Sequence, residues 1–310
     1  MWFKNLKLFR LSNTWNWTAE QVDAFLAKEQ FVSPGAAAPV ASGWTPPRED
    51  DVRLAYSVDR QILCAFRSEK KLLPASVINQ FVKQRAIELE EQQGFKPGRK
   101  QLRDLKEEVT NALIPRAFSL TRDTRIWIDP VNHWLVIDTA SATKAEEILS
   151  ALGKAIYPFP VEPIQVTISP AVAMTQWLTS GQAPANFTID QDAELRAGGD
   201  QAAAIRYVKH ALDSVDIEKH IQSGKQCTRL ALTWHDKVSF VLTEALDIKR
   251  VAPQDILDES DQLAPANEAE KFDGEFTLMC AELNQLLAAL LESLEEKTLN
   301  TQKARPHLIS

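Results

Sequence analysis

The sequence predicts an α+β protein of mixed antiparallel sheets with helices. Apolar and polar residues alternate in some stretches, which is the period of a strand, and apolar residues recur at three- and four-residue steps in others, which is the period of a helix. The two patterns lack the regular strand–helix–strand spacing of a doubly wound sheet. A chain of 310 residues, 45% of them hydrophobic, is long enough for two or three cores.

The first part of the chain predicts two strands separated by a helix and a loop. Leucines alternate with lysines over residues 5–11, and apolar residues alternate with their neighbours over residues 61–67. A capping box of Thr18 and Gln21 precedes a helix that runs to about residue 30. Glycines and prolines over residues 33–47 predict a loop.

Residues 75–114 predict a protruding helical hairpin. Two amphipathic stretches are interrupted by Gly94 and by Pro97-Gly98, which are helix-stop and turn residues. We therefore expect two antiparallel helices that bury their apolar stripes against each other. The stripes are Ile78, Phe81, Val82, Ala86 and Leu89 in the first helix, and Leu102, Leu105, Val109, Ala112 and Leu113 in the second.

The tip of this hairpin is basic. One acid, Asp104, accompanies five bases, which are Lys96, Arg99, Lys100, Arg103 and Lys106. The charge fits two interpretations equally well: an ordinary solvated helix face, or a tip that contacts phosphates.

The segment after the hairpin contains an aromatic residue between two arginines. Pro115 should end the second helix, which leaves Phe118 in a loop between Arg116 and Arg122. Such a phenylalanine is usually an anchor folded onto its own domain. The alternative is a protruding contact for a partner subunit.

The later elements alternate between strands and helices. Strands at 125–129 and 133–139 join through a short turn, Thr143 and Glu146 cap a helix that runs to about residue 156, and prolines over 157–163 indicate a linker. Further strands are expected at 164–169, 187–195 and 204–208, helices at 170–178 and 215–223, a strand pair at 228–234 and 238–246, and a long helix at 276–296.

These elements predict four regions. Residues 1–74 and 115–160 form a central α+β domain, residues 75–114 form the hairpin tip, residues 161–297 form a second α+β domain, and residues 298–310 form a disordered tail. The leucine stripe of the long helix is more typical of an intramolecular core than of a dimer seam.

The net charge of −7 does not exclude a nucleic-acid partner. Residues 254–275 contain eight acids and one base, Lys271, which accounts for the whole of that charge. The rest of the chain is neutral on balance and can present one basic face. The acidic segment would then lie away from the DNA.

Several classes of protein and site are not indicated. No apolar run approaches the length of a membrane span, and no signal-peptide core follows Met1. Cys64, Cys227 and Cys280 predict buried thiols in a reducing compartment, the cytoplasm. The histidines form no zinc motif, and no phosphate-binding loop or nucleophile motif occurs. We expect no metal, no cofactor and no catalytic site.

Basic groups indicate contact with a phosphate backbone rather than with bases, because neither a recognition helix nor an aromatic RNA-binding motif is evident. A further cluster places Arg206 near Lys209 and Lys225. The candidate DNA-binding residues are Lys83, Arg85, Lys96, Arg99, Lys100, Arg103, Arg116, Arg122, Lys209 and Lys225.

Six segments in order resemble the RdgC family of bacterial recombination-associated proteins, from Met1 to about residue 294. They are MWFKNLKLFRL at the start, GWTPP at 43–47, KKLLPASVI at 70–78, LIPRAFS at 113–119, WIDPVNHWLVIDTASATKAEE at 127–147 and FDGEFTLMCAEL at 272–283. The resemblance implies a nucleoid-associated, ring-shaped homodimer that binds duplex DNA without sequence specificity and restrains RecA-type recombinases in recombination and replication-fork repair.

The same resemblance implies two subunit contacts. Phe118 lies in the matching LIPRAFS segment and would form a gate-like contact, while Lys209 and His210 would border a second interface. Two other function classes stay open. The hairpin could dock a protein partner with DNA binding incidental, or, as the least favoured class, the protein could process nucleic acid enzymatically.

Overall fold

The computed structural model describes residues 1–35, 38–199, 203–210, 212, 214–254 and 267–295. Within them, twelve strands form one sheet in the order β2-β4-β5-β6-β1-β12-β11-β10-β8-β9, with β3 added to β4 and β7 to β1. Every pairing between these strands is antiparallel. The protein is therefore α+β, as the mixed periodicity predicts.

The first half of the sheet comes from the N-terminal half of the chain. Its strands are β1 (Asn5–Leu11), β2 (Val40–Thr45), β3 (Ala55–Val58), β4 (Gln61–Lys71), β5 (Ser119–Asp129), β6 (Trp134–Asp138) and β7 (Val161–Pro163). Its helices are α1 (Ala19–Leu26), extended by a 3-10 turn over Ala27–Glu29, and α4 (Ala142–Ala155). The predicted capping box is present, because Thr18 and Gln21 each accept a backbone N–H of the other.

The second half comes from the rest of the chain. Its elements are α5 (Pro170–Ser180), β8 (Phe187–Ala197), β9 (Ala204–Tyr207), α6 (Ser214–Gln222), β10 (Lys225–Trp234), β11 (Val238–Thr243), β12 (Ile248–Pro253) and α8 (Glu268–Ser293). The halves join where β1 pairs with β12, through Asn5 opposite Lys249 and Leu6 opposite Ile248. β1 therefore makes the sheet continuous.

The two faces of this sheet carry different cores. Leu63, Trp127 and Val136 share one core with the strands of the second half and with α8. Cys64, Ile126 and Ile137 point the other way and form a second core with α1 and α4. Strand alternation explains the division, because each next residue along β4, β5 and β6 points to the opposite face.

Helix α8 ties the two halves together. Asn284 accepts the indole N–H of Trp134 at 2.9 Å, and Glu282 pairs with Lys237 on the second half at 2.8 Å. The leucine stripe is intramolecular core, as expected: it is buried at Leu283, Leu286, Leu287, Leu290 and Leu291. None of the described helices is long and apolar enough to cross a membrane.

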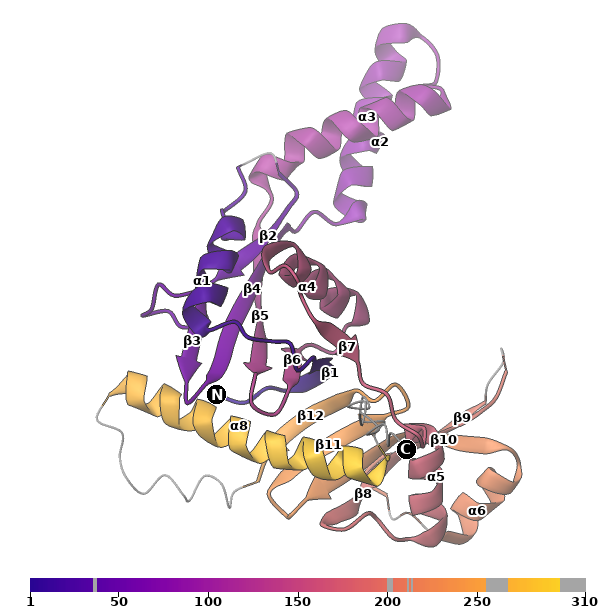
Figure 1. The fold of residues 1–310 in the computed structure, drawn as a ribbon. Helices are drawn as coiled ribbons and strands as arrows, with labels where there is room; N and C mark the ends of the chain where they lie inside the picture. Colours follow the sequence, from indigo (N-terminus) through magenta and orange to yellow (C-terminus); the bar gives the residue numbers. More distant parts are fainter. Residues whose placement is uncertain (36–37, 200–202, 211, 213, 255–266, 296–310) are drawn as a thin grey trace, which may run out of the picture.

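Two consecutive helices, α2 (Ala75–Gln93) and α3 (Arg99–Leu113), project from the end of β4 and β5 (Figure 1). With the 3-10 turn Ile114–Arg116 we call them the helical arm. Gly94 ends α2 in the left-handed conformation that favours glycine, with φ of 79°. The side-chain amide of Gln101 caps α3 by accepting the Gly98 N–H, and it also donates to Gln93 across the turn.

The arm helices bury their predicted stripes only in part. Helix α2 has no buried residue, and in α3 only Val109 is buried. Of the predicted stripes, Phe81 and Leu102 are exposed, and Val82 and Leu89 are half-buried. The polar link between Gln93 and Gln101 joins the helices near the turn, and much of their apolar surface meets solvent instead of the facing helix.

Four further local predictions need correction. The expected loop over 33–47 contains strand β2, Val40–Thr45, which pairs with β4. Ser141, not Thr143, caps α4, because its hydroxyl accepts the Lys144 N–H. Residues 164–169 do not form the predicted strand. The N–H groups of Thr167 and Ile168 instead donate to carbonyl oxygens at the end of α8. The predicted loop around Arg122 belongs to β5, which begins at Ser119 and pairs along β4.

The three cysteines are buried and free, as the sequence predicts. Burial is the main cause of a raised pKa at each thiol, and it raises the pKa of Cys227 to about 12. The predicted tail at 298–310 and most of the acidic segment, 255–266, lie outside the described residues.

Candidate nucleic-acid interface

Arginines gather on the sheet face opposite α8, over the second half of the sheet. Arg206 on β9 and Arg229 on β10 both lie opposite Glu194 on β8, so the three form a row across adjacent strands. Arg196 lies two residues beyond Glu194 and therefore on the same face. We call this surface, formed by the side chains of β8–β12 that point away from α8, the open face.

Glu194 is the centre of this group. Its side chain is 4% exposed, whereas those of Arg196, Arg206 and Arg229 are 41%, 61% and 48% exposed. The Nε atoms of Arg196 and Arg206 donate to its carboxylate at 2.6 and 2.5 Å, and Arg229 lies at 4.0 Å. Burial acts to raise the pKa of Glu194, but the arginine hydrogen bonds outweigh it and hold the pKa below its usual value.

Further bases continue the open face toward the first half. Arg206 and Arg229 line a shallow pocket of 230 Å³ together with Lys249 and Arg250. Arg250 lies 3.7 Å from Asp192, and Lys249 lies 3.8 Å from Asp247, which also pairs with Lys7 at 2.6 Å. The open face therefore carries five bases and three acids, Asp190, Asp192 and Glu194, with Lys7 and Asp247 at its border. This excess of bases makes a surface suited to polyanions.

The arm presents a second basic group. Arg99, Arg103 and Lys106 follow each other at four- and three-residue steps and share one side of α3. Arg99 and Lys100 occupy the first turn of α3, which contains no acid. A helix N-terminus is electropositive, so cations there are unfavourable unless an anion is nearby. Lys83 and Lys96 are exposed on the same arm.

Acids are interleaved with the bases of the arm. Arg85 pairs with Glu88 at 3.3 Å, and Arg103 lies 3.7 Å from Asp104. A groove between α2 and α3 is lined by three carboxylates and one guanidinium, those of Glu88, Asp104, Glu108 and Arg85. The arm therefore has one basic side and one acidic groove.

The other predicted DNA-binding residues lie at separate places. Arg116 is exposed in the turn at the base of the arm, and Arg122 is exposed on β5. Lys209 follows β9 with φ of 50°, and its N–H donates to Asp192. Lys225 pairs with Ala197, which puts it on the face opposite Arg196, and its amine donates to Ser223. Helices α2 and α3 thus lie far from strand β9, which Lys209 follows (Figure 1).

Sequence reasoning missed most of the open face. The predicted DNA-binding residues do not include Arg196, Arg229, Lys249 or Arg250. Arg206 appears only in the cluster with Lys209 and Lys225. Each is an isolated base in an alternating strand. Only the register of strands β8 to β12 brings them together, and no local pattern in the sequence predicts that register.

The predicted contact residues differ in exposure and setting. Phe118 is 84% exposed, between the arm and β5, and its carbonyl accepts the Leu72 N–H. Because its side chain is so exposed, Phe118 is not folded onto its own domain. The neighbouring side chains of Leu72 and Leu120 are exposed as well. His210 is exposed, its ring is 6.1 Å from that of Tyr207, and its N–H donates to Gln191.

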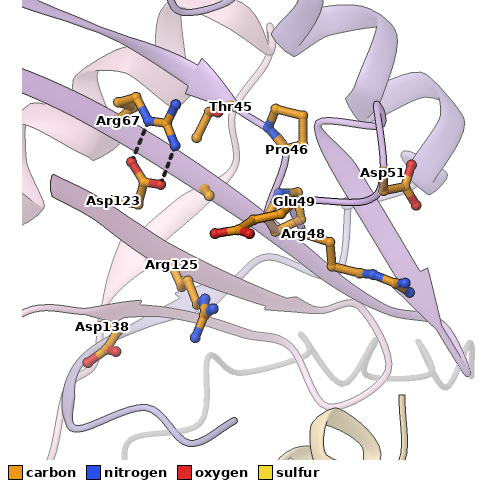
Figure 2. A pocket seen from close by; sticks show the side chains of 11 residues that line it. Thr45, Pro46, Arg48, Glu49, Asp51, Arg67, Asp123, Arg125 and Asp138 are labelled. Atoms are coloured by element: carbon orange, nitrogen blue, oxygen red, sulfur yellow. Dashed lines mark hydrogen bonds and ion pairs between the residues drawn. The ribbon is translucent and has the colours of Figure 1, made fainter. Parts of the chain in front are cut away.

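A mixed-charge pocket of 490 Å³ lies on the first half of the sheet, among Thr45, Arg48, Arg67, Asp123 and Arg125 (Figure 2). Arg67 holds Asp123 by two hydrogen bonds of 2.7 Å. Another lining carboxylate, Asp51, is bonded to Arg53, which lowers the pKa of Asp51 to about 2. These carboxylates are neutralised by guanidiniums. Among the residues described, no three His, Cys, Asp or Glu side chains are grouped so as to hold a metal ion.

A family model described as "Putative exonuclease, RdgC" matches residues 1–297. Proteins named recombination-associated protein RdgC are 55% identical in Bordetella parapertussis over 294 residues (95% of this chain and 98% of that one), 54% in Burkholderia cenocepacia over 295 (95% of each), and 50% in Herminiimonas arsenicoxydans over 294 (95% and 98%). Matches that cover nearly the whole of both chains place this protein in the RdgC family of recombination-associated proteins.

Proposed function

We propose that this protein binds double-stranded DNA without reading its sequence, encircles the DNA as a ring-shaped homodimer, and so restrains RecA-type recombinases on the nucleoid. The observation that carries the proposal is the open face: Arg196, Arg206 and Arg229 on three adjacent strands, next to Lys249 and Arg250. Bases arrayed on a sheet neutralise phosphates, which supplies affinity for any duplex.

The position of the arginines favours contact with the DNA backbone. They stand on strands of a broad sheet, and neither Arg206 nor Arg229 belongs to a helix that would enter a major groove. Phosphate contacts fix the position of a protein on DNA but carry no direct sequence information. Unrelated duplexes should therefore bind with similar affinity.

The described part of the acidic segment lies away from the open face. Asp273 in α8 accepts the Tyr56 hydroxyl at 2.5 Å and lies 3.6 Å from Arg48, and Glu275 pairs with the amino group of Met1. Helix α8 packs on the opposite face of the sheet. These acids therefore leave the positive potential of the open face largely intact.

Two self-complementary contacts would close a two-subunit ring. The first would use Phe118 with Leu72 and Leu120, an exposed apolar group of the kind that marks interfaces. The second would lie near Lys209 and His210, beyond the short edge strand β9, where the sheet ends. The arm and the strand end are far apart, as two separate ring contacts require (Figure 1).

Salt titration tests the binding proposal. The dissociation constants of two duplexes of unrelated sequence are measured by fluorescence anisotropy from about 50 to 200 mM salt. With several phosphate contacts the affinity should fall by about 10³-fold or more over that range, equally for both duplexes. Affinity that does not change with salt, or a large preference for one sequence, would refute the proposal.

The second candidate is a scaffold that docks a protein through the arm. The exposed apolar residues of α2 and α3, among them Phe81, Ile87 and Leu102, favour it. A partner that stays bound to the protein after nuclease treatment, together with no shift of naked DNA, would support the scaffold over the DNA ring.

The description of the family model raises a third candidate, an exonuclease. We propose binding without catalysis, since Asp123 and Asp51 of the mixed-charge pocket are held by arginines and Asp138 accepts the backbone N–H groups of Lys4 and Asn5. End-labelled duplex incubated with Mg²⁺ or Mn²⁺ tests this. Cleavage that one carboxylate substitution abolishes would favour the nuclease.

A further inference from the structure

A buried carboxylate at the centre of a basic surface opposes the binding of an anion. Glu194 lies between Arg206 and Arg229, and it reduces the net positive charge that DNA would meet. Its side chain is 4% exposed and is surrounded by polar donors, including the Thr228 hydroxyl at 3.4 Å. A favourable role must therefore offset the repulsion between Glu194 and the DNA.

The hydrogen bonds of Glu194 indicate what that role is. Arg196 donates through Nε to Oε1, and Arg206 donates through Nε to Oε2, so each carboxylate oxygen fixes one guanidinium. No terminal nitrogen of these two arginines takes part in those two bonds. Since Arg206 is 61% and Arg196 is 41% exposed, both guanidiniums remain accessible while their orientation is set from below.

We propose that Glu194 is a positioning residue for phosphate binding, which holds Arg196 and Arg206 with their terminal nitrogens available to the DNA backbone. This inference rests on the proposed function. Long arginine side chains lose conformational freedom when they bind, and a partner that fixes them beforehand removes part of that cost. The gain in preorganisation then exceeds the repulsion between one buried carboxylate and the duplex.

The substitution Glu194→Gln separates the two effects because they have opposite signs. The change removes a negative charge, so simple electrostatics predicts tighter binding. Glutamine offers one acceptor oxygen and one donor group in place of two acceptors, so one arginine loses its partner. Positioning therefore predicts weaker binding, by up to about tenfold at about 100 mM salt, because that arginine regains its conformational freedom.

Asp192→Asn is the matched control. Asp192 lies two residues before Glu194 on the same face of β8, 3.7 Å from Arg250. Asparagine keeps an oxygen that can accept the Lys209 N–H, which Asp192 accepts at 2.8 Å. The substitution removes the charge and its 3.7 Å ion pair with Arg250, but no hydrogen bond to a guanidinium, so binding should tighten slightly.

Glu194→Asp is the second variant, for the case in which the glutamine variant does not fold. It keeps the charge and shortens the side chain by one methylene group. Positioning predicts weaker binding, whereas a purely electrostatic role predicts the affinity of the unmodified protein. The folded state of each variant is checked by its thermal unfolding midpoint.

The dissociation constant of each variant for a duplex, measured by fluorescence anisotropy, distinguishes positioning from a purely electrostatic role. Weaker binding by folded Glu194→Gln or Glu194→Asp, with tighter binding by Asp192→Asn, supports the inference. Glu194→Gln that binds as tightly as Asp192→Asn, or Glu194→Asp that binds like the unmodified protein, overturns it. If the unmodified protein binds no duplex at low salt, the proposed function fails instead, and that result is distinct from either outcome.

Discussion

The open face and the helical arm both carry bases, but they support them in different ways. On the open face the bases stand on paired strands above a core closed by α8, and two of them are fixed by the buried Glu194. On the arm they stand on two helices with a single buried residue between them, and acids lie close to Arg85 and Arg103. Charge of the same sign is therefore rigidly placed in one region and loosely placed in the other.

The difference indicates separate roles. Fixed arginines on a sheet suit repeated contact with a regular phosphate backbone, because less freedom is lost on binding. A projecting arm with exposed apolar residues suits contact with another protein surface, including a second copy of the chain. Four predictions follow from this comparison, in order of expected effect.

The largest effect should be on stability. Leu287→Ala in α8 removes a fully buried side chain and should lower the free energy of unfolding by about 2–5 kcal/mol. Ile87→Ala in the arm, at a side chain that is 51% exposed, should change it by about 0.5 kcal/mol or less. Urea unfolding measures both, and equal losses would show that the arm is packed as firmly as the sheet.

Phe118→Ala should weaken self-association. An exposed aromatic anchor at the centre of an interface contributes about 2 kcal/mol, so the dissociation constant of the dimer should rise about 30-fold. Sedimentation velocity over a range of concentrations measures it. Phe95→Ala, at the turn of the arm and 62% exposed, is the control and should leave the dimer unchanged. An equal rise of the dissociation constant in both variants would show that Phe118 has no special role in self-association.

Charge removal should separate the two regions in their response to salt. Arg229→Gln with Arg250→Gln should reduce the slope of log affinity against log salt by about two, since each lost phosphate contact contributes about 0.9. Arg99→Gln with Arg103→Gln on the arm should reduce it by about one or less, because Asp104 already lies near Arg103. The reverse order would make the arm the main contact with DNA.

The smallest effect should appear in acid. The pKa of Glu194 is lowered in the folded protein, so its ionised form contributes stability above its unfolded pKa of about 4.3, and that contribution is lost as pH falls through the folded pKa. The free energy of unfolding should therefore fall as the pH drops below about 4.3 toward the folded pKa, and Glu194→Gln should lack this part of the decrease. If the free energies of unfolding of the unmodified protein and of Glu194→Gln fell in parallel with pH, the prediction would be wrong.

Much of the local structure follows from the sequence. The capping box of Thr18 and Gln21, the helix after Ser169 and the leucine stripe of α8 all occur where residue patterns predict them. These features depend on residues a few positions apart, whose hydrogen bonds and shared faces are set by the chain itself. The six segments that resemble the RdgC family were likewise sufficient to identify the family.

Local patterns failed where distant residues decide the outcome. Residues 164–169 alternate like a strand, yet their N–H groups bond to the end of α8. The arm helices have amphipathic stripes that predict mutual burial, yet α2 buries no residue. In both places the periodicity correctly marks residues that prefer burial. It cannot say which surface, if any, covers them.

The sequence by itself determined the α+β class, most of the helices and strands, the buried thiols and the family, because these depend on periodicity, capping and ordered motifs. Only the tertiary structure decided that β1 and β12 join the two halves into one sheet, and that Arg206, Glu194 and Arg229 form a row across it. Strand register depends on pairing between residues far apart in the chain, and a shift by one residue would send each of these side chains to the other face.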